Sequence, residues 1–369
     1  MNTPERPSSL LERIEALVRT DPSFSDIHLR EGLPMRVRES GRLSANDDLV
    51  VTRAMLHELL AKVSPHPCWS DRLGLGGGQW DFSCSLAQAR LRCNLHRCDG
   101  GQALALVMRR LDACPGNLEA LGLPLAVREF VERRAGLMLV TGPTGAGKST
   151  TLSALVDHIN GARDGKIITI EDPIEILHVS RRCTIVQREV GTDVDSFSQG
   201  LRAAFRQDPD VILIGEIRDR DTMETALAAA EAGHLVLATL HTLSAAKTVD
   251  RIADFFSGED KAQVRGVLAS VLLAVIGQVL LPREDGAGRV LAWELMEVTP
   301  AIASLIRDGR SHQIPNAIST GASDKLQLLN RSLAQLVRAR LVSLPEARRA
   351  SYDPRELDRE LADRELHHV

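Results

Sequence analysis

LMLVTGPTGAGKSTT, residues Leu137 to Thr151, is the stretch of this 369-residue chain that decides its fold. It holds the pattern G-x-x-x-x-G-K-[ST] between an apolar run and a helical pattern, which is the setting that a phosphate-binding P-loop needs. Glycines let backbone N–H groups close around phosphate oxygens, and the start of a helix adds a favourable dipole. The sequence therefore predicts an α/β fold with a nucleotide site at this turn. The residues expected to bind the nucleotide are Gly142, Pro143, Thr144, Gly145, Ala146, Gly147, Lys148, Ser149 and Thr150.

Lys148 and Ser149 carry the chemistry of this motif. We expect Lys148 to neutralise the β and γ phosphates of ATP, and the Ser149 hydroxyl to bind Mg²⁺. A chance glycine-rich loop is the alternative, and the strand and helix patterns on either side of the motif count against it.

Carboxylates follow two of the apolar runs beyond the P-loop. Glu216 comes after one run, and we expect it to polarise the attacking water. Glu171, Asp172 and Glu175 follow another run, where three carboxylates repel one another unless a cation lies among them. The sequence therefore predicts Mg²⁺ near Asp172 as well as Ser149, with Glu171 as a second catalytic candidate. Solvated surface carboxylates are the alternative for both groups.

His234 and His241 flank a fourth apolar run. A lone histidine is usually structural, but two beside a core strand of a nucleotide domain could respond to the γ phosphate through a hydrogen bond. Side-chain chemistry alone leaves both interpretations open.

The pattern of apolar residues divides the chain into four parts. Residues 1–112 mix short β-like runs with one helical stretch, Arg53 to Val63, so we expect a small α+β domain. Residues 113–124 are rich in proline and glycine and predict a linker, which would serve as the hinge. Residues 125–298 alternate buried strands with helices, the pattern of a covered parallel sheet. Residues 299–369 show only helical spacing and predict a helical appendage.

Composition excludes several classes of protein. The formal net charge of −4 gives no sign of a polybasic binder, and aromatic residues at 3% are too few for single-strand stacking platforms. None of the six cysteines stands in a C-x-x-C pair, so we expect no zinc site. Because the start of the chain lacks a secretory signal, we expect a cytoplasmic protein with reduced thiols.

The longest uncharged stretch runs from Gly266 to Leu281 and has 16 residues. A helix that spans a bilayer needs about 20 apolar residues. We therefore expect this stretch to form a buried core helix.

Four blocks of sequence, taken in chain order, resemble the motifs of one family. GPTGAGKSTT, ITIEDPIE, DPDVILIGEIRD and AGHLVLATLHT resemble the Walker A, aspartate-box, Walker B and histidine-box segments of secretion ATPases in the type II and type IV pilus superfamily. SDIH at 25–28 and ARLRCN at 89–94 resemble the family's amino-terminal signatures S-D-[IL]-H and A-R-F-R-V-N. The likeness covers most of the chain.

The resemblance implies an architecture and further site residues. It implies a PAS-like N-terminal domain, a RecA-like P-loop domain with the C-terminal helical appendage, and a ring of six chains. It implies that Arg90 and Arg92 reach the bound nucleotide, whereas the sequence alone would make them exposed strand cations. It also favours His234 and His241 as part of the catalytic site.

Two departures bear on the branch of the family. The retraction element A-I-R-N-L-I appears as AIASLI at 301–306, without its arginine and asparagine. No cysteine follows Cys183, although assembly and secretion ATPases of the superfamily commonly carry a four-cysteine zinc module there. The second departure favours the retraction branch, and the first puts the direction of work in doubt.

The resemblance therefore implies a homo-hexameric, Mg²⁺-dependent ATPase that powers type IV pilus retraction and twitching motility. It would work at the cytoplasmic face of the inner membrane, on a platform protein, with peripheral membrane association and no direct nucleic-acid contact. An assembly or secretion ATPase of a conjugative, type II or type IV secretion system, and an accessory retraction paralogue, stay open. A DNA translocase and a non-hydrolysing scaffold are alternatives of other classes.

Overall fold

The computed structural model describes residues 9–21, 23–39, 41–75, 77–111, 118–321 and 323–362. The chain divides into two compact units. The N-terminal unit comprises residues 1–114 with the short segments 172–177 and 189–195, and the P-loop unit comprises the remainder. Residue 112 and residues 113–117 of the predicted linker lie outside the described residues, and so do residues 363–369.

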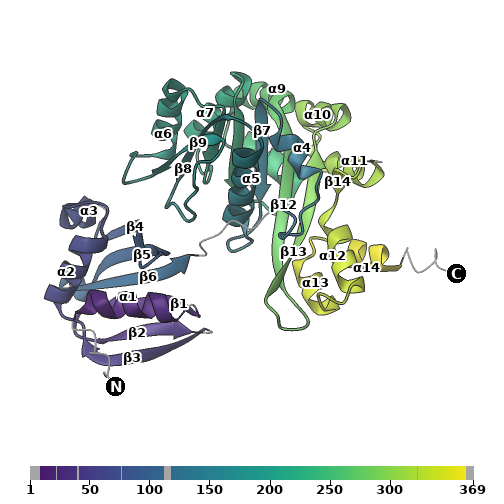
Figure 1. Ribbon diagram of the computed structural model, residues 1–369. Coiled ribbons are helices and arrows are strands. Elements are labelled where there is room, and N and C mark those ends of the chain that lie inside the picture. Colours follow the sequence, from purple (N-terminus) through teal and green to yellow (C-terminus); the bar gives the residue numbers. More distant parts are fainter. Residues whose placement is uncertain are drawn as a thin grey trace. The chain divides into compact units, whose positions relative to one another are not determined.

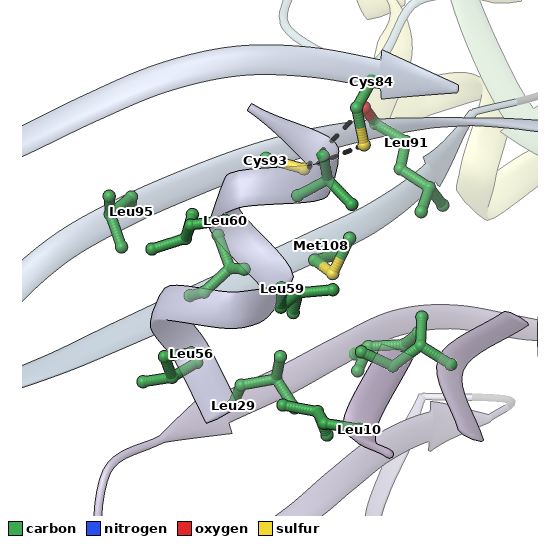
Figure 2. Packing of buried hydrophobic residues seen from close by; sticks show 14 of the residues in the cluster. Leu10, Leu29, Leu56, Leu59, Leu60, Cys84, Leu91, Cys93, Leu95 and Met108 are labelled. Atoms are coloured by element: carbon green, nitrogen blue, oxygen red, sulfur yellow. Dashed lines mark hydrogen bonds between the residues drawn. The ribbon is translucent and has the colours of Figure 1, made fainter. Parts of the chain in front are cut away.

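The N-terminal unit is built on one antiparallel sheet with the strand order β3-β2-β1-β6-β5-β4. Its elements are α1 (Leu10–Thr20), β1 (Phe24–Arg30), β2 (Pro34–Glu39), β3 (Arg42–Val50), α2 (Arg53–Val63), α3 (Trp69–Leu75), β4 (Gln79–Leu86), β5 (Ala89–Cys98), η1 (Asp99–Gly101) and β6 (Ala103–Leu111). Strand alternation buries Ile27 and Leu29 of β1, and α2 contributes Leu56, Leu59 and Leu60 to the same core. Figure 2 shows this packing together with residues of β4, β5 and β6. The predicted small α+β domain is therefore present.

Glu189 explains why two segments of the predicted ATPase core belong to the N-terminal unit. Its carboxylate is buried and accepts hydrogen bonds from the backbone N–H groups of Ile174, at 3.0 Å, and Ser83, at 3.3 Å. The Ser83 hydroxyl also donates to Glu189, and the Arg90 guanidinium lies 3.6 Å from it. One buried carboxylate thus joins residues more than a hundred positions apart, which no local sequence pattern reveals.

The P-loop unit is built on an eight-stranded sheet with the order β14-β13-β12-β7-β11-β10-β8-β9. Neighbours from β12 to β8 pair in parallel, and β13 pairs antiparallel with β12 and β14. Its strands are β7 (Gly136–Thr141), β8 (Gly165–Glu171), β9 (Cys183–Glu189), β10 (Val211–Ile214), β11 (Leu235–Leu240), β12 (Leu272–Pro282), β13 (Arg289–Glu297) and β14 (Leu326–Gln327). Every residue of β7, β10 and β11 is buried, as expected of parallel strands covered on both faces.

Helices connect and cover these strands, as Figure 1 shows. They are α4 (Val127–Val131), α5 (Lys148–Ala162), α6 (Phe197–Ala204), η2 (Phe205–Gln207), α7 (Arg220–Glu231), α8 (Ala245–Asp254), α9 (Asp260–Val271), α10 (Pro300–Arg307), η3 (Ser311–Gln313), α11 (Ile314–Thr320), α12 (Leu329–Arg338), α13 (Leu344–Ala350) and α14 (Pro354–Ala362). The last three helices share a small apolar core with β12 and β13.

Two expectations about secondary structure are wrong. The stretch Gly266 to Leu281 does not form one buried helix, because α9 ends at Val271 and β12 begins at Leu272. The apolar residues of β12 pair with β7 on one side and β13 on the other, so tertiary pairing overrides a pattern that length alone could not assign. The C-terminal region also contains one short strand, β14, although only helical spacing was visible there.

Candidate nucleotide site

The candidate site lies where parallel strands of the P-loop unit end. β7 ends at Thr141 and leads into the P-loop, β11 ends at Leu240 just before His241, and β10 ends two residues before Glu216. Ligands of open α/β sheets bind outside these carboxyl ends. The fold therefore gathers at one edge three segments that stand far apart in the sequence.

The P-loop has a shape that only glycine allows at two positions. Gly142 has a φ of 146°, and a Cβ there would collide with the carbonyl oxygen of Gln278. Gly147 caps the N-terminus of α5 with a φ of 85°, a left-handed conformation. The loop thus turns sharply from β7 into α5, as a phosphate cradle requires.

Gln278 of β12 holds this loop from beneath. Its side chain is buried, its Nε2 donates a hydrogen bond of 2.6 Å to the Ala146 carbonyl, and its Oε1 accepts one of 3.0 Å from Thr151 Oγ1. Gln278 therefore ties the turn of the loop to the first turns of α5. This role of Gln278 was not predicted, because its only signal in the sequence is a lone amide within an apolar stretch.

Lys148 folds back over the loop. Its Nζ donates hydrogen bonds of 3.0 Å to the carbonyl oxygens of Gly142 and Pro143, and it lies 3.4 Å from His241 Nδ1. The ammonium group thus donates to two uncharged carbonyl oxygens at the loop. A phosphate group would offer it a stronger, fully charged partner.

His241 links Lys148 to the predicted catalytic carboxylate. Its Nε2 lies 3.0 Å from Glu216 Oε1, and the Arg218 guanidinium lies 2.7 Å from Glu216 Oε2. Burial by itself would raise the pKa of Glu216, but the hydrogen bond and charge of Arg218, with His241, hold that pKa below its usual value. Glu216 is therefore an ionised carboxylate at neutral pH, oriented through both of its oxygens.

Comparison with known proteins decides the family. The family model described as "Type II/IV secretion system protein" matches residues 77–349. The chain belongs to this family. It is 42% identical to the type IV pilus retraction ATPase PilT of Pseudomonas aeruginosa, over 89% of this chain and 95% of PilT. It is 45% identical to the uncharacterized protein YggR of Escherichia coli, over 84% of this chain and 93% of YggR.

A solved structure bears out the architecture. The crystal structure of the pilus retraction motor PilT with bound ADP superimposes with a TM-score of 0.85 and 42% identity, and covers 95% of this chain and 99% of that one. The predicted two-domain fold of a P-loop ATPase in the secretion superfamily, related to the retraction motor, is therefore confirmed. The ADP bound in the PilT structure shows that the family binds nucleotide, and this chain belongs to that family.

Glu171 and its acidic neighbours do not form a shared metal site. Glu171 Oε1 accepts hydrogen bonds from Thr169 Oγ1, at 2.6 Å, and Gln187 Nε2, at 3.2 Å, while Glu175 lies 3.8 Å from Arg92. Asp172 is exposed and belongs to the N-terminal unit. Within the described part of the chain, no group of three His, Cys, Asp or Glu residues could hold a metal ion. Protein groups therefore hold Glu171 and Glu175 separately, and Mg²⁺ binding at Asp172 stays a prediction.

His234 lies away from the other predicted catalytic residues of the P-loop unit. It precedes β11, at the end of the strand opposite His241, and its Nδ1 lies 3.0 Å from the Ala229 carbonyl oxygen. Its ring also contacts Phe205. Six strand residues separate the two histidines, so within this chain they lie too far apart to act on one phosphate, and a catalytic role for His234 stays a prediction.

Arg90 and Arg92 lie on β5 with different partners. The Arg90 side chain is largely covered: besides its ion pair with Glu189, its Nε donates a hydrogen bond of 3.3 Å to the Ile174 carbonyl oxygen. The Arg92 side chain is 42% exposed, and its pair with Glu175 is long at 3.8 Å. Their predicted contact with nucleotide stays a prediction.

The described residues contain no helix that is both long enough and apolar enough to cross a bilayer.

Proposed function

We propose that this chain is the ATP-hydrolysing subunit of a hexameric motor that powers retraction of a type IV pilus. The observation that supports it most is the continuous contact from Lys148 through His241 to Glu216. It places a cation for phosphate, a group that can respond to phosphate, and an ionised base in one row at the end of the sheet.

Each residue of this row has a defined part in ATP hydrolysis. Lys148 exchanges its two backbone carbonyl partners for the β and γ phosphates of the substrate. Glu216 orients the attacking water and accepts its proton, which its lowered pKa allows at neutral pH. His241 contacts Lys148 through Nδ1 and Glu216 through Nε2, so its hydrogen bonds change when Lys148 moves.

Mg²⁺ fits the first turn of α5, where Ser149 is exposed and offers its hydroxyl. When bound, the ion neutralises charge on the transferred phosphate. Asp172 is the second residue that the sequence predicts as a Mg²⁺ ligand.

The motor requires more than one chain. Arg92 is the exposed arginine of the pair and is the better candidate to reach nucleotide, whereas Arg90 holds the segments 172–177 and 189–195 on the N-terminal unit. Hydrolysis would then change how the two units of neighbouring subunits meet, and the ring would act on an inner-membrane platform protein from the cytoplasmic side.

Complementation of a retraction-deficient strain tests this function. The wild-type chain is expected to restore twitching and pilus withdrawal, and Lys148→Ala to restore neither. Lys166→Ala, at the opposite end of the sheet on β8, is the matched control and should behave as wild type. Full retraction with Lys148→Ala would contradict the proposal.

An accessory retraction ATPase is a second candidate, favoured by α10. In this helix Ala303 and Ser304 stand where the retraction element A-I-R-N-L-I has its arginine and asparagine. The apolar residues Ile302 and Ile306 are still present and buried. Restoration of retraction only when a second retraction ATPase is present would select this candidate.

A further inference from the structure

Glu294 of β13 is a buried carboxylate outside the nucleotide site. It is buried and stands opposite Gly277 of β12, where an added Cβ would lie 3.4 Å from the Glu294 Cβ, an ordinary van der Waals contact. Burial raises the pKa of Glu294 to about 7. A carboxylate removed from water in this way needs a structural or functional reason.

The two oxygens of Glu294 hold the first residues of two helices. Oε1 accepts a hydrogen bond of 2.6 Å from the Ala245 N–H of α8, and Oε2 accepts one of 3.4 Å from the Leu329 N–H of α12. The residue before α12 is Leu328, whose side chain cannot cap the helix. Glu294 is therefore a shared cap for helices that start 84 positions apart in the chain, at 245 and 329.

One of these helices begins next to the nucleotide site. Only residues 241–244 lie between the end of β11 and the start of α8. Thr242 Oγ1 lies 2.7 Å from Thr248 Oγ1 of α8, and Thr248 Oγ1 donates a hydrogen bond of 2.8 Å to the Ser244 carbonyl. These hydrogen bonds tie the segment that follows His241 to the start of α8.

The other helix leads to the C-terminal helices. Asn330, the second residue of α12, donates through Nδ2 to Glu356 Oε2 of α14 at 2.6 Å and accepts through Oδ1 from Ser351 Oγ at 2.6 Å. A cavity of about 300 Å³ adjoins Glu294 and is also lined by Leu329, Asn330, Tyr352 and Glu356. The start of α12, which carries Leu329 and Asn330, thus borders a cavity beside Glu294.

We propose that Glu294 is a positioning residue that couples the state of the nucleotide site to the C-terminal helices α12 and α14. Nucleotide draws Lys148 away from His241, the segment that begins with His241 moves α8, and Glu294 carries this movement to α12. The inference rests on the proposed function, because His241 must respond to nucleotide. It extends that function by naming the residues through which hydrolysis at the P-loop would move the C-terminal helices α12 and α14.

Hydrogen–deuterium exchange on the full chain tests the coupling, with and without Mg²⁺ and a non-hydrolysable ATP analogue. In Glu294→Gln the amide oxygen can still accept from Ala245, but the amide nitrogen cannot accept from Leu329. The wild type should change exchange in the P-loop, α8 and α12 on binding, at α12 by about fivefold or more, the lower end of coupling between sites. Glu294→Gln should keep the first two changes and lose the third.

Two further variants make the result specific. Glu297→Gln, on the same strand and half-buried beside Lys325, is the matched control and should behave as wild type. In the wild type α14 should also change exchange on binding, because Asn330 joins it to α12. Asn330→Ala should keep the change in α12 and lose the change in α14, which tests the route without altering Glu294.

The outcomes separate this inference from the proposed function. A wild-type chain whose P-loop peptides ignore the nucleotide would overturn both. A P-loop response with no response in α12, or an α12 response in Glu294→Gln equal to the wild type, would overturn the coupling alone and leave the ATPase proposal standing.

Discussion

His241 is in contact with Glu216 through one ring nitrogen and with Lys148 through the other, at 3.0 Å and 3.4 Å. An imidazole between a carboxylate and an ammonium changes its hydrogen bonds whenever either partner moves. In the proposed function, Lys148 moves when phosphate replaces the loop carbonyls. The same histidine is therefore placed both to hold the proposed catalytic carboxylate, Glu216, and to respond when nucleotide binds.

Glu216→Gln is expected to keep ATP binding and lose turnover by about a hundredfold or more, since the amide cannot accept a proton from water. Turnover and nucleotide retention in single-turnover assays measure both effects. Glu231→Gln, an exposed glutamate at the end of α7, is the control. Turnover near the wild-type rate would move the catalytic role to Glu171.

The two histidines should separate cleanly. His241→Ala is expected to lower turnover by about a hundredfold, the effect of removing one group that supports charge in the transition state. His234→Ala should leave turnover within about twofold and lower thermal stability, because its partners are the Ala229 carbonyl and the Phe205 ring. Equal losses of turnover in both variants would restore His234 to the site.

Replacing Arg90 should mainly lower stability, whereas replacing Arg92 should mainly lower turnover. Arg90→Ala leaves the buried carboxylate of Glu189 without its cation and is expected to destabilise the N-terminal unit by about 3 kcal/mol. Arg92→Ala removes a long, half-exposed pair and should change stability little while lowering turnover of the assembled ring. Thermal unfolding and steady-state turnover measure the two effects, and unchanged turnover in Arg92→Ala would make it a surface cation.

Gln278→Ala is expected to destabilise the P-loop unit by about 1 to 3 kcal/mol, because it removes two buried hydrogen bonds and leaves the Ala146 carbonyl unsatisfied. KM for ATP should rise more than kcat falls, since in the variant the P-loop would be less well held before the substrate binds. Gln263→Ala, exposed on α9, is the control. An unchanged KM would limit Gln278 to packing.

The stability of Glu294→Gln relative to wild type should depend on pH. The folded pKa is raised from 4.5 to about 7, so the stabilisation is complete below pH 4.5 and is lost as pH rises through about 7. Glutamine does not titrate, so the variant should gain about 3 kcal/mol relative to wild type across this window. Urea unfolding from pH 5 to pH 8 measures the difference, and a constant difference would contradict it. The other titratable groups that line the cavity are Tyr352, Asp353, Glu356 and Arg359.

The sequence by itself determined the P-loop, the parallel strands and the family. The pattern from Gly142 to Ser149 is local, and a strand buried on both faces must be apolar along its length, so neighbouring residues carry enough information. The helix Arg53–Val63 of the N-terminal unit was predicted at its observed bounds for the same reason. Glu216 could be chosen because a carboxylate follows a buried strand.

Tertiary structure alone decided which polar groups meet. Gln278, Glu189 and Glu294 interrupt apolar or mixed stretches, and each accepts or donates hydrogen bonds with groups from distant elements. The same reason separated His241 from His234, which flank one strand but lie at its opposite ends. A buried polar side chain needs its partners wherever the fold brings them, and sequence spacing does not record that distance.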